Sequence, residues 1–292
     1  MTRFFKVAGH VFGLEIPEDK CLRLGLDQYA PFETDSSEGC IFVLSLVGSL
    51  PGGPLETVYD APVEDGATRV VLSRCGRDWL FDISADHRLP VCASLWASED
   101  LSDARLMLKS RSSSDALFAV NNSMMLIYAF RTASLGTLEM HASMVSNSGR
   151  AFLFLARSGT GKSTHSRLWL KNIPGSELMN DDNPVVRVWP DGRVVAYGSP
   201  WSGKTSCYRN VEAPVGAFVK IRRCSENRIT PLSLPEAYAE VYSSCSGFKA
   251  DSRMADGLHE SIASAVTKIP SYVLDCRPDD EAAQVCAREL LK

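Results

Sequence analysis

Apolar and polar positions alternate in short runs over the first third of the chain, with turn residues between the runs. This alternation is typical of β-strands that bury one face. The predicted strands lie at 4–8, 11–16, 41–47, 68–72, 79–83 and 89–96. The pattern therefore predicts a β-rich N-terminal domain, and it gives no indication of what that domain does.

The pattern changes after a serine-rich connector at 109–115. Residues 116–134 have the length and the lack of breakers that favour a helix. Beyond them, strands are predicted at 138–145, 151–155, 185–189, 194–197 and 217–221, and helices at 162–171, 234–244, 254–267 and 279–291. We therefore predict a mixed α/β (α+β) fold with two domains, 1–115 and 116–292.

Composition narrows the function classes. A chain of 292 residues with 45% hydrophobic residues and a formal net charge of −4 is typical of a globular protein and gives no reason to expect nucleic acid as a partner. The nine cysteines contain no CxxC pair, which favours reduced thiols over a disulfide framework or zinc site. The most apolar long stretch, 116–133, contains Asn121, Asn122 and Arg131, which argues against a membrane-spanning helix. Charged residues interrupt the apolar pattern at the N-terminus, which argues against a signal peptide. We expect a cytoplasmic protein with no membrane anchor.

A glycine-rich segment follows the predicted strand at 151–155. Residues 156–163 read A-R-S-G-T-G-K-S, which fits the phosphate-binding loop pattern with alanine in place of its first glycine. Glycines let the backbone curl so that its N–H groups meet phosphate oxygens at the positive end of the following helix. The residues expected to contact the nucleotide are Ser158, Gly159, Thr160, Gly161, Lys162, Ser163 and Thr164.

Two side chains of this segment indicate a triphosphate bound with a metal. Lys162 can reach the β- and γ-phosphates, and the Ser163 hydroxyl is placed to ligate Mg²⁺. The predicted ligands are therefore ATP and Mg²⁺, while GTP and pyrophosphate remain open as alternatives to ATP.

Two adjacent acids, Asp181 and Asp182, follow a short apolar run. Acids of this kind can hold Mg²⁺, and neighbouring carboxylates raise each other's proton affinity, which makes one of them a candidate base. The alternative is an Asx-type turn that opens the next strand. The nearby phosphate loop favours the functional interpretation.

His141 precedes the phosphate loop in a predicted strand. A strand histidine is usually a packed residue. Beside an acidic pair, it could instead orient a carboxylate, share its proton or ligate a second cation. The sequence leaves these roles open.

Together, His141, the loop and the acid pair resemble the nucleotide site of HPr kinase/phosphorylase and phosphoenolpyruvate carboxykinase. The resemblance spans about 137–220. It implies a P-loop core with a mixed sheet, with Asp181 as the base, Asp182 as the metal ligand and His141 beside them, although the two acids could exchange roles. The segment 198–204 also resembles a loop in HPr-kinase-like proteins of peptide-modification gene clusters, which implies that Trp201 and Lys204 lie on the acceptor side; an ordinary turn is the alternative.

The chain also departs from these families. It lacks the glutamate-arginine-glycine signature that HPr kinases carry after the acid pair, and it is much shorter than a carboxykinase. HPr as acceptor and decarboxylation are therefore disfavoured. We expect an ATP-dependent kinase that phosphorylates a hydroxyl, with a serine of a peptide, protein or small molecule favoured. Relatives of the HPr kinase type are often oligomeric, so a homo-oligomer is also considered. The rival hypothesis is a nucleotide-gated binding protein without transfer.

Overall fold

In a computed structural model, residues 2–17, 25–60, 68–203, 205–248 and 251–292 are described. The chain divides into two compact units. The first comprises Met1–Arg131 and Phe248–Asp251, and the second comprises Thr132–Gly247 and Ser252–Lys292. Both units contain a mixed sheet, so the predicted mixed α/β class is confirmed.

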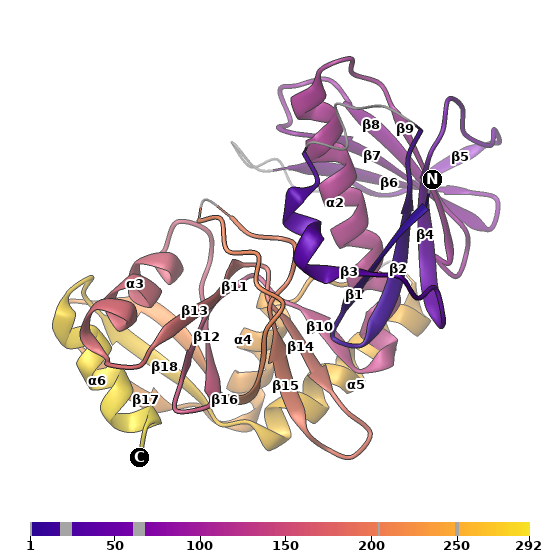
Figure 1. Cartoon of the computed structure of the whole chain (residues 1–292). Coiled ribbons are helices and arrows are strands. Elements are labelled where there is room, and N and C mark those ends of the chain that lie inside the picture. Colours follow the sequence, from indigo (N-terminus) through magenta and orange to yellow (C-terminus); the bar gives the residue numbers. More distant parts are fainter. Residues whose placement is uncertain (1, 18–24, 61–67, 204, 249–250) are drawn as a thin grey trace. The chain divides into compact units, whose positions relative to one another are not determined.

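The first unit is built on a twisted sheet covered by a long helix (Figure 1). In spatial order its described strands are β3 (Glu33–Thr34), β1 (Thr2–Val7), β2 (His10–Glu15), β4 (Cys40–Leu46), β9 (Asp103–Leu108), β8 (Ala93–Ala97), β7 (Asp78–Ser84), β6 (Arg69–Cys75) and β5 (Leu55–Asp60). β4 runs parallel to β2 and β9, and the other pairs are antiparallel. The covering helices are the 3-10 helix η1 (Asp27–Phe32) and α2 (Ser113–Thr132). Tyr128 of α2 packs edge-on against Phe12 of the sheet, which places aromatic rings at the centre of this core.

The second unit has a mixed sheet as well. In spatial order its strands are β10 (Thr137–Glu139), β14 (Val185–Val188), β15 (Val194–Tyr197), β16 (Glu212–Arg223), β12 (Arg150–Leu155), β11 (Ala142–Asn147) and β13 (Glu177–Asp182). β16 runs parallel to β12 and also to β18 (Ser271–Cys276), which pairs in turn with β17 (Arg228–Pro231). Because β12 lies between β16 and β11, the segment that follows it starts from the interior of the sheet.

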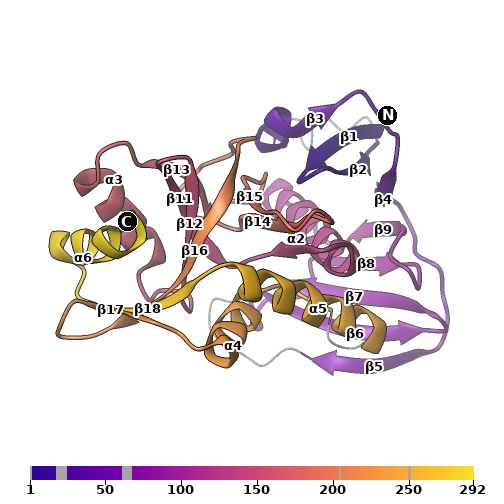
Figure 2. The same ribbon diagram turned by 90° about the horizontal axis from the view of Figure 1, so that it is seen from below.

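Helices cover both faces of this second sheet. α3 (Lys162–Asn172) and α6 (Asp280–Leu290) lie side by side (Figures 1 and 2) and bury Trp169 and Cys286 against one face. α4 (Leu234–Ser244) and α5 (Ser252–Lys268) bury Val241 and Ile262 against the other face. The sheet is therefore buried on both sides, which explains the nearly continuous apolar run of β12.

Several predicted elements differ from the structure. The strand predicted at 138–145 is two strands, β10 and β11, with a break at Met140 and His141. α2 begins at Ser113, inside the serine-rich connector, and it groups with the first unit, whereas the pattern put a boundary at 115. The strands that the pattern missed are β3, β5, β9, β13, β17 and β18. The acid pair thus lies at the end of a strand, and Oδ1 of Asn180 accepts from the N–H of Asn183 where the chain turns toward β14.

Candidate functional site: a phosphate loop with a histidine and two acids

The glycine-rich segment joins β12 to α3, as the sequence predicts. Gly159 has φ 73° and Gly161, the residue before α3, has φ 128°. Side chains with a Cβ rarely adopt these conformations, and an added Cβ would meet no atom within 4 Å at either position. The glycines are therefore required for the backbone path and not for space. That path leads into the N-terminal turn of α3, and the free backbone amides of such a turn are suited to anions.

The remaining residues of the loop differ in exposure. Ser158 is exposed, and Thr160, Ser163 and Thr164 are half-buried. Ser163 is the second residue of α3, the position from which its hydroxyl would reach a metal next to the phosphates.

Lys162 is buried and turned toward the sheet. Its Nζ lies 2.6 Å from Nε2 of His141 and donates to the carbonyl of Ala156 at 3.2 Å. Burial lowers the pKa of Lys162, and the nearby carboxylates of Asp182 and Asp181 oppose that change. The ammonium group of Lys162 thus contacts His141 and the carbonyl of Ala156, and it could exchange these contacts for phosphate oxygens.

His141 connects this lysine to the acid pair. It stands at the break between β10 and β11, where its backbone N–H donates to the carbonyl of Ser244 at 2.6 Å. Its Nδ1 lies 3.0 Å from Oδ1 of Asp182. Because Nε2 faces an ammonium donor, we assign the ring proton to Nδ1, which then donates to Asp182. The result is a continuous chain of contacts from Lys162 through His141 to Asp182.

The two acids end β13 and point to different surroundings, since neighbouring strand residues face opposite sides. Asp182 adopts φ 125°, which a residue with a side chain rarely does. Burial would raise the pKa of Asp182, but its contact with His141 and the charge of Lys162 bring that pKa below its ordinary value. Asp181 is 4% exposed, and its Oδ1 has no hydrogen-bond partner among the described residues. Such a buried oxygen is suited to accept a proton or a cation.

The predicted acceptor-side segment packs against these acids. Ser202 donates from Oγ to the carbonyl of Asp181 at 2.9 Å, and the N–H of Gly203 donates to the same carbonyl at 2.7 Å. Asn180, fully buried, donates to Oγ of Ser199 at 3.2 Å and ties the base of this segment to β13. The segment is therefore part of the same site.

The two predicted substrate residues of this segment have different outcomes. The side chain of Trp201 is 4% exposed, so it is packed inside the protein and not displayed as an open apolar plane. Lys204 lies outside the described residues.

The candidate Mg²⁺ ligands come from two elements. Within the described part of the chain, no group of three or more His, Cys, Asp or Glu side chains is arranged to hold a metal by itself. The carboxylate of Asp182 and the hydroxyl of Ser163 are oxygen donors of the kind that Mg²⁺ prefers. Mg²⁺ usually keeps waters and phosphate oxygens in its shell, so this small protein donor set fits it.

Arginine presents a planar fork that suits phosphate oxygens, so Arg209, Arg222 and Arg223 are candidate further cations. Arg223 donates to the carbonyls of Gly159 at 2.6 Å and Thr160 at 3.0 Å, so it holds the phosphate loop from the end of β16. Arg222 pairs with Asp275, and Arg209 pairs with Glu177 at 2.8 Å. Only Arg223 therefore contacts the loop directly.

Glu139 is a residue that the sequence analysis missed. It is fully buried on β10, and burial raises its pKa to about 7. The available signal was a glutamate inside the apolar run of Leu138 and Met140, because such a residue rarely lies in a buried strand without a specific environment.

No protein-family model matches the chain, and a search of curated proteins finds no significant match. None of the helices in the described ranges is long and apolar enough to cross a membrane.

Proposed function

We propose that this protein is an ATP- and Mg²⁺-dependent kinase that transfers the γ-phosphoryl group to a hydroxyl, with a serine of a peptide, protein or small molecule favoured as acceptor. The observation that carries the proposal is the contact chain Lys162–His141–Asp182 beside a glycine-rich loop and a second, buried acid. The order of histidine, loop and acid pair along the chain, on a mixed sheet, supports a core of the HPr kinase and phosphoenolpyruvate carboxykinase type.

Each residue has a role in this proposal. Mg·ATP, when bound, supplies the transferable phosphoryl group and a divalent cation. Lys162 exchanges its contact with His141 for phosphate oxygens and stabilises the charge of the transferring group. Ser163 and Asp182 would hold the metal, and His141 orients Asp182 through its Nδ1 proton. Asp181 accepts the proton of the acceptor hydroxyl as the new O–P bond forms and the bond to the departing ADP breaks.

The test is incubation of the protein with γ-labelled ATP and a cell extract, followed by identification of the labelled acceptor. We expect Lys162→Ala to lose both Mg·ATP binding in calorimetry and transfer. Asp181→Asn is expected to keep Mg·ATP binding and to lose transfer by about 100-fold or more, because a positioned base contributes at least that factor. Asp182→Asn is expected to weaken the binding of Mg·ATP itself.

Three outcomes would contradict parts of the proposal. Full transfer by Asp181→Asn would show that Asp181 is not the base. Unchanged Mg·ATP affinity in Lys162→Ala would remove the phosphate site. Tight Mg·ATP binding without any labelled acceptor would favour a nucleotide-gated binding protein over a kinase.

A further inference from the structure

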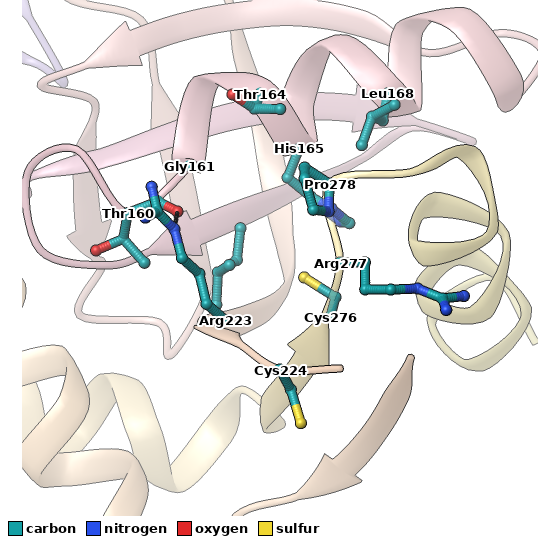
Figure 3. A pocket seen from close by; sticks show the side chains of 11 residues that line it. Thr160, Gly161, Thr164, His165, Leu168, Arg223, Cys224, Cys276, Arg277 and Pro278 are labelled. Atoms are coloured by element: carbon teal, nitrogen blue, oxygen red, sulfur yellow. Dashed lines mark hydrogen bonds between the residues drawn. The ribbon is translucent and has the colours of Figure 1, made fainter. Parts of the chain in front are cut away.

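A cavity of about 400 Å³ adjoins the phosphate loop beside α3 (Figure 3). One wall is formed by Thr160 and Gly161 of the loop and by side chains from the first turns of α3, including Leu168. The opposite wall comes from the ends of β16 and β18, where Cys224 and Cys276 lie. Cavities that bind small ligands begin at roughly 300 Å³, so this one is large enough for a nucleoside.

The cavity is lined mainly by uncharged side chains. Among the described residues that line it the cations are Arg223 and Arg277, and Arg277 pairs with Asp279 and Glu281. Leu168 and Pro278 contribute apolar surface. Burial is the main reason that the pKa of Cys276 is raised to about 11, so this thiol is neutral near pH 7. None of the described residues that line the cavity is Asp or Glu. Such walls suit a flat, uncharged aromatic ring better than a further phosphate.

Arg223 connects the cavity to the phosphate loop. Its guanidinium is held by the carbonyls of Gly159 and Thr160, and it also lines the cavity. A planar guanidinium fixed by its hydrogen bonds leaves its face available for stacking on an aromatic ring. A ligand whose phosphates occupy the loop would therefore find an apolar cavity with a stacking group directly next to it.

We propose that this cavity binds the nucleobase and ribose of the phosphate donor, so the donor is a nucleoside triphosphate and not an inorganic polyphosphate. The inference rests on the proposed function, because it takes the loop as the triphosphate site. It adds a second contact region, formed by α3, β16 and β18, that distinguishes ATP or GTP from phosphate chains that lack a base.

Calorimetry on the full chain compares Mg·ATP, Mg·GTP and magnesium tripolyphosphate. Tripolyphosphate carries at least as much negative charge as ATP, so a preference for ATP or GTP would report contacts with the base and ribose. We expect the better nucleotide to bind at least about tenfold more tightly than tripolyphosphate. The same comparison shows which base the cavity favours.

A pair of variants on α3 provides the control. Leu168→Trp fills the cavity and is expected to lower nucleotide affinity at least about tenfold, while tripolyphosphate affinity stays within about twofold. Leu170→Trp adds the same bulk at a position that is 39% exposed and does not line the cavity, so it should change neither affinity.

A measurement on the unaltered protein avoids any folding defect of the variants. Cys224 is an exposed thiol at the cavity, so iodoacetamide should alkylate it, as followed by peptide mass spectrometry. We expect the nucleotide to protect Cys224 and tripolyphosphate not to protect it. Equal affinities for nucleotide and tripolyphosphate, or equal protection, would overturn the base-binding inference and leave the triphosphate site standing. Absence of binding by all three ligands would overturn both.

Discussion

Asp182 is held from two sides at the residue scale. His141 contacts its Oδ1 at 3.0 Å, and Gly203 approaches so closely that an added Cβ would lie 3.0 Å from Cβ, Cγ and Oδ2 of Asp182. Contacts between a Cβ and other heavy atoms are rarely this short. Glycine at position 203 therefore allows the backbone there to lie close to the carboxylate of Asp182. The position of Asp182 therefore depends on Gly203, which has no side chain to take part in the reaction.

Gly203→Ala is expected to displace Asp182 and to loosen its contact with His141. Phosphoryl transfer should fall by about tenfold to 100-fold, because small misplacements of catalytic groups have effects of this size. The free energy of unfolding should change by less than about 1 kcal/mol. Gly48→Ala, where an added Cβ meets nothing within 4 Å, is the matched control. Transfer rates of Gly203→Ala and Gly48→Ala that do not differ would show that the close approach is without functional effect.

His165 is a buried histidine whose ring accepts a hydrogen bond from a neighbouring tryptophan. Its Nε2 accepts from Trp169 at 3.1 Å, and Phe154 packs edge-on against its ring. Burial lowers its pKa from 6.5 to about 3, so the folded protein keeps the ring neutral where the unfolded chain would protonate it. The stabilising contribution is complete above the unfolded pKa and is lost as pH falls toward the folded pKa.

The lowered pKa of His165 predicts that the free energy of unfolding decreases in acid. Between pH 6.5 and about pH 4 the unfolded state binds one more proton at this site, so the free energy of unfolding should fall by about 3 kcal/mol through His165. Denaturant unfolding at several pH values should show this slope in the wild type, and His165→Gln should reduce it. Equal slopes in both proteins would mean that the ring titrates normally.

At the scale of elements, sequence periodicity predicted the apolar strands and the long helices but not the polar strands. β12 and α4 follow from an apolar run and from regular spacing, respectively. β13 was missed because its sequence ELMNDD ends in polar residues, whose strand conformation depends on pairing with β11. Local patterns cannot report pairing of this kind.

In the candidate site, too, some features follow from the local sequence and others depend on distant parts of the chain. The loop follows from its own residues, because Gly159 and Gly161 need conformations that other residues avoid. The contacts of His141 depend on a break between β10 and β11 and on a hydrogen bond to α4, which come from distant parts of the chain. The residues were therefore predictable, and their distances were not.

Gly257 lies within α5, where alanine would ordinarily stabilise a helix by about 1 kcal/mol. An added Cβ here would lie 2.6 Å from Cα of Ser134, in the 3-10 helix η2 (Ala133–Leu135). Since that atom is backbone, Gly257→Ala should separate α5 from η2 and destabilise the protein by about 1–3 kcal/mol. Thermal unfolding would measure the change. Ala263→Gly, on the exposed face of α5, measures the ordinary difference in helix stability between alanine and glycine for comparison. A stabilised Gly257→Ala would contradict the close packing.

At the scale of the whole molecule, the chain passes between the two units more than once. Phe248–Asp251 belongs to the first unit, although the residues on either side belong to the second. Phe248 is 3% exposed and packs against Trp79 at 4.6 Å and Phe130 at 4.9 Å between ring centroids. A single cut near residue 115 or 131 would therefore remove Phe248 from the core that surrounds it.

Phe248→Ala tests whether this short segment stabilises the first unit. Loss of a buried phenylalanine costs about 3–5 kcal/mol, so hydrogen exchange in β7, which contains Trp79, should accelerate strongly. Leu89→Ala, at a side chain that is 54% exposed, should have almost no effect. Because Phe248 packs within the first unit, Mg·ATP affinity and the exchange of β12 should stay near wild-type values. Unchanged protection of β7 would show that the segment contributes little to that core, and equal loss in β7 and β12 would show that the two units unfold as one.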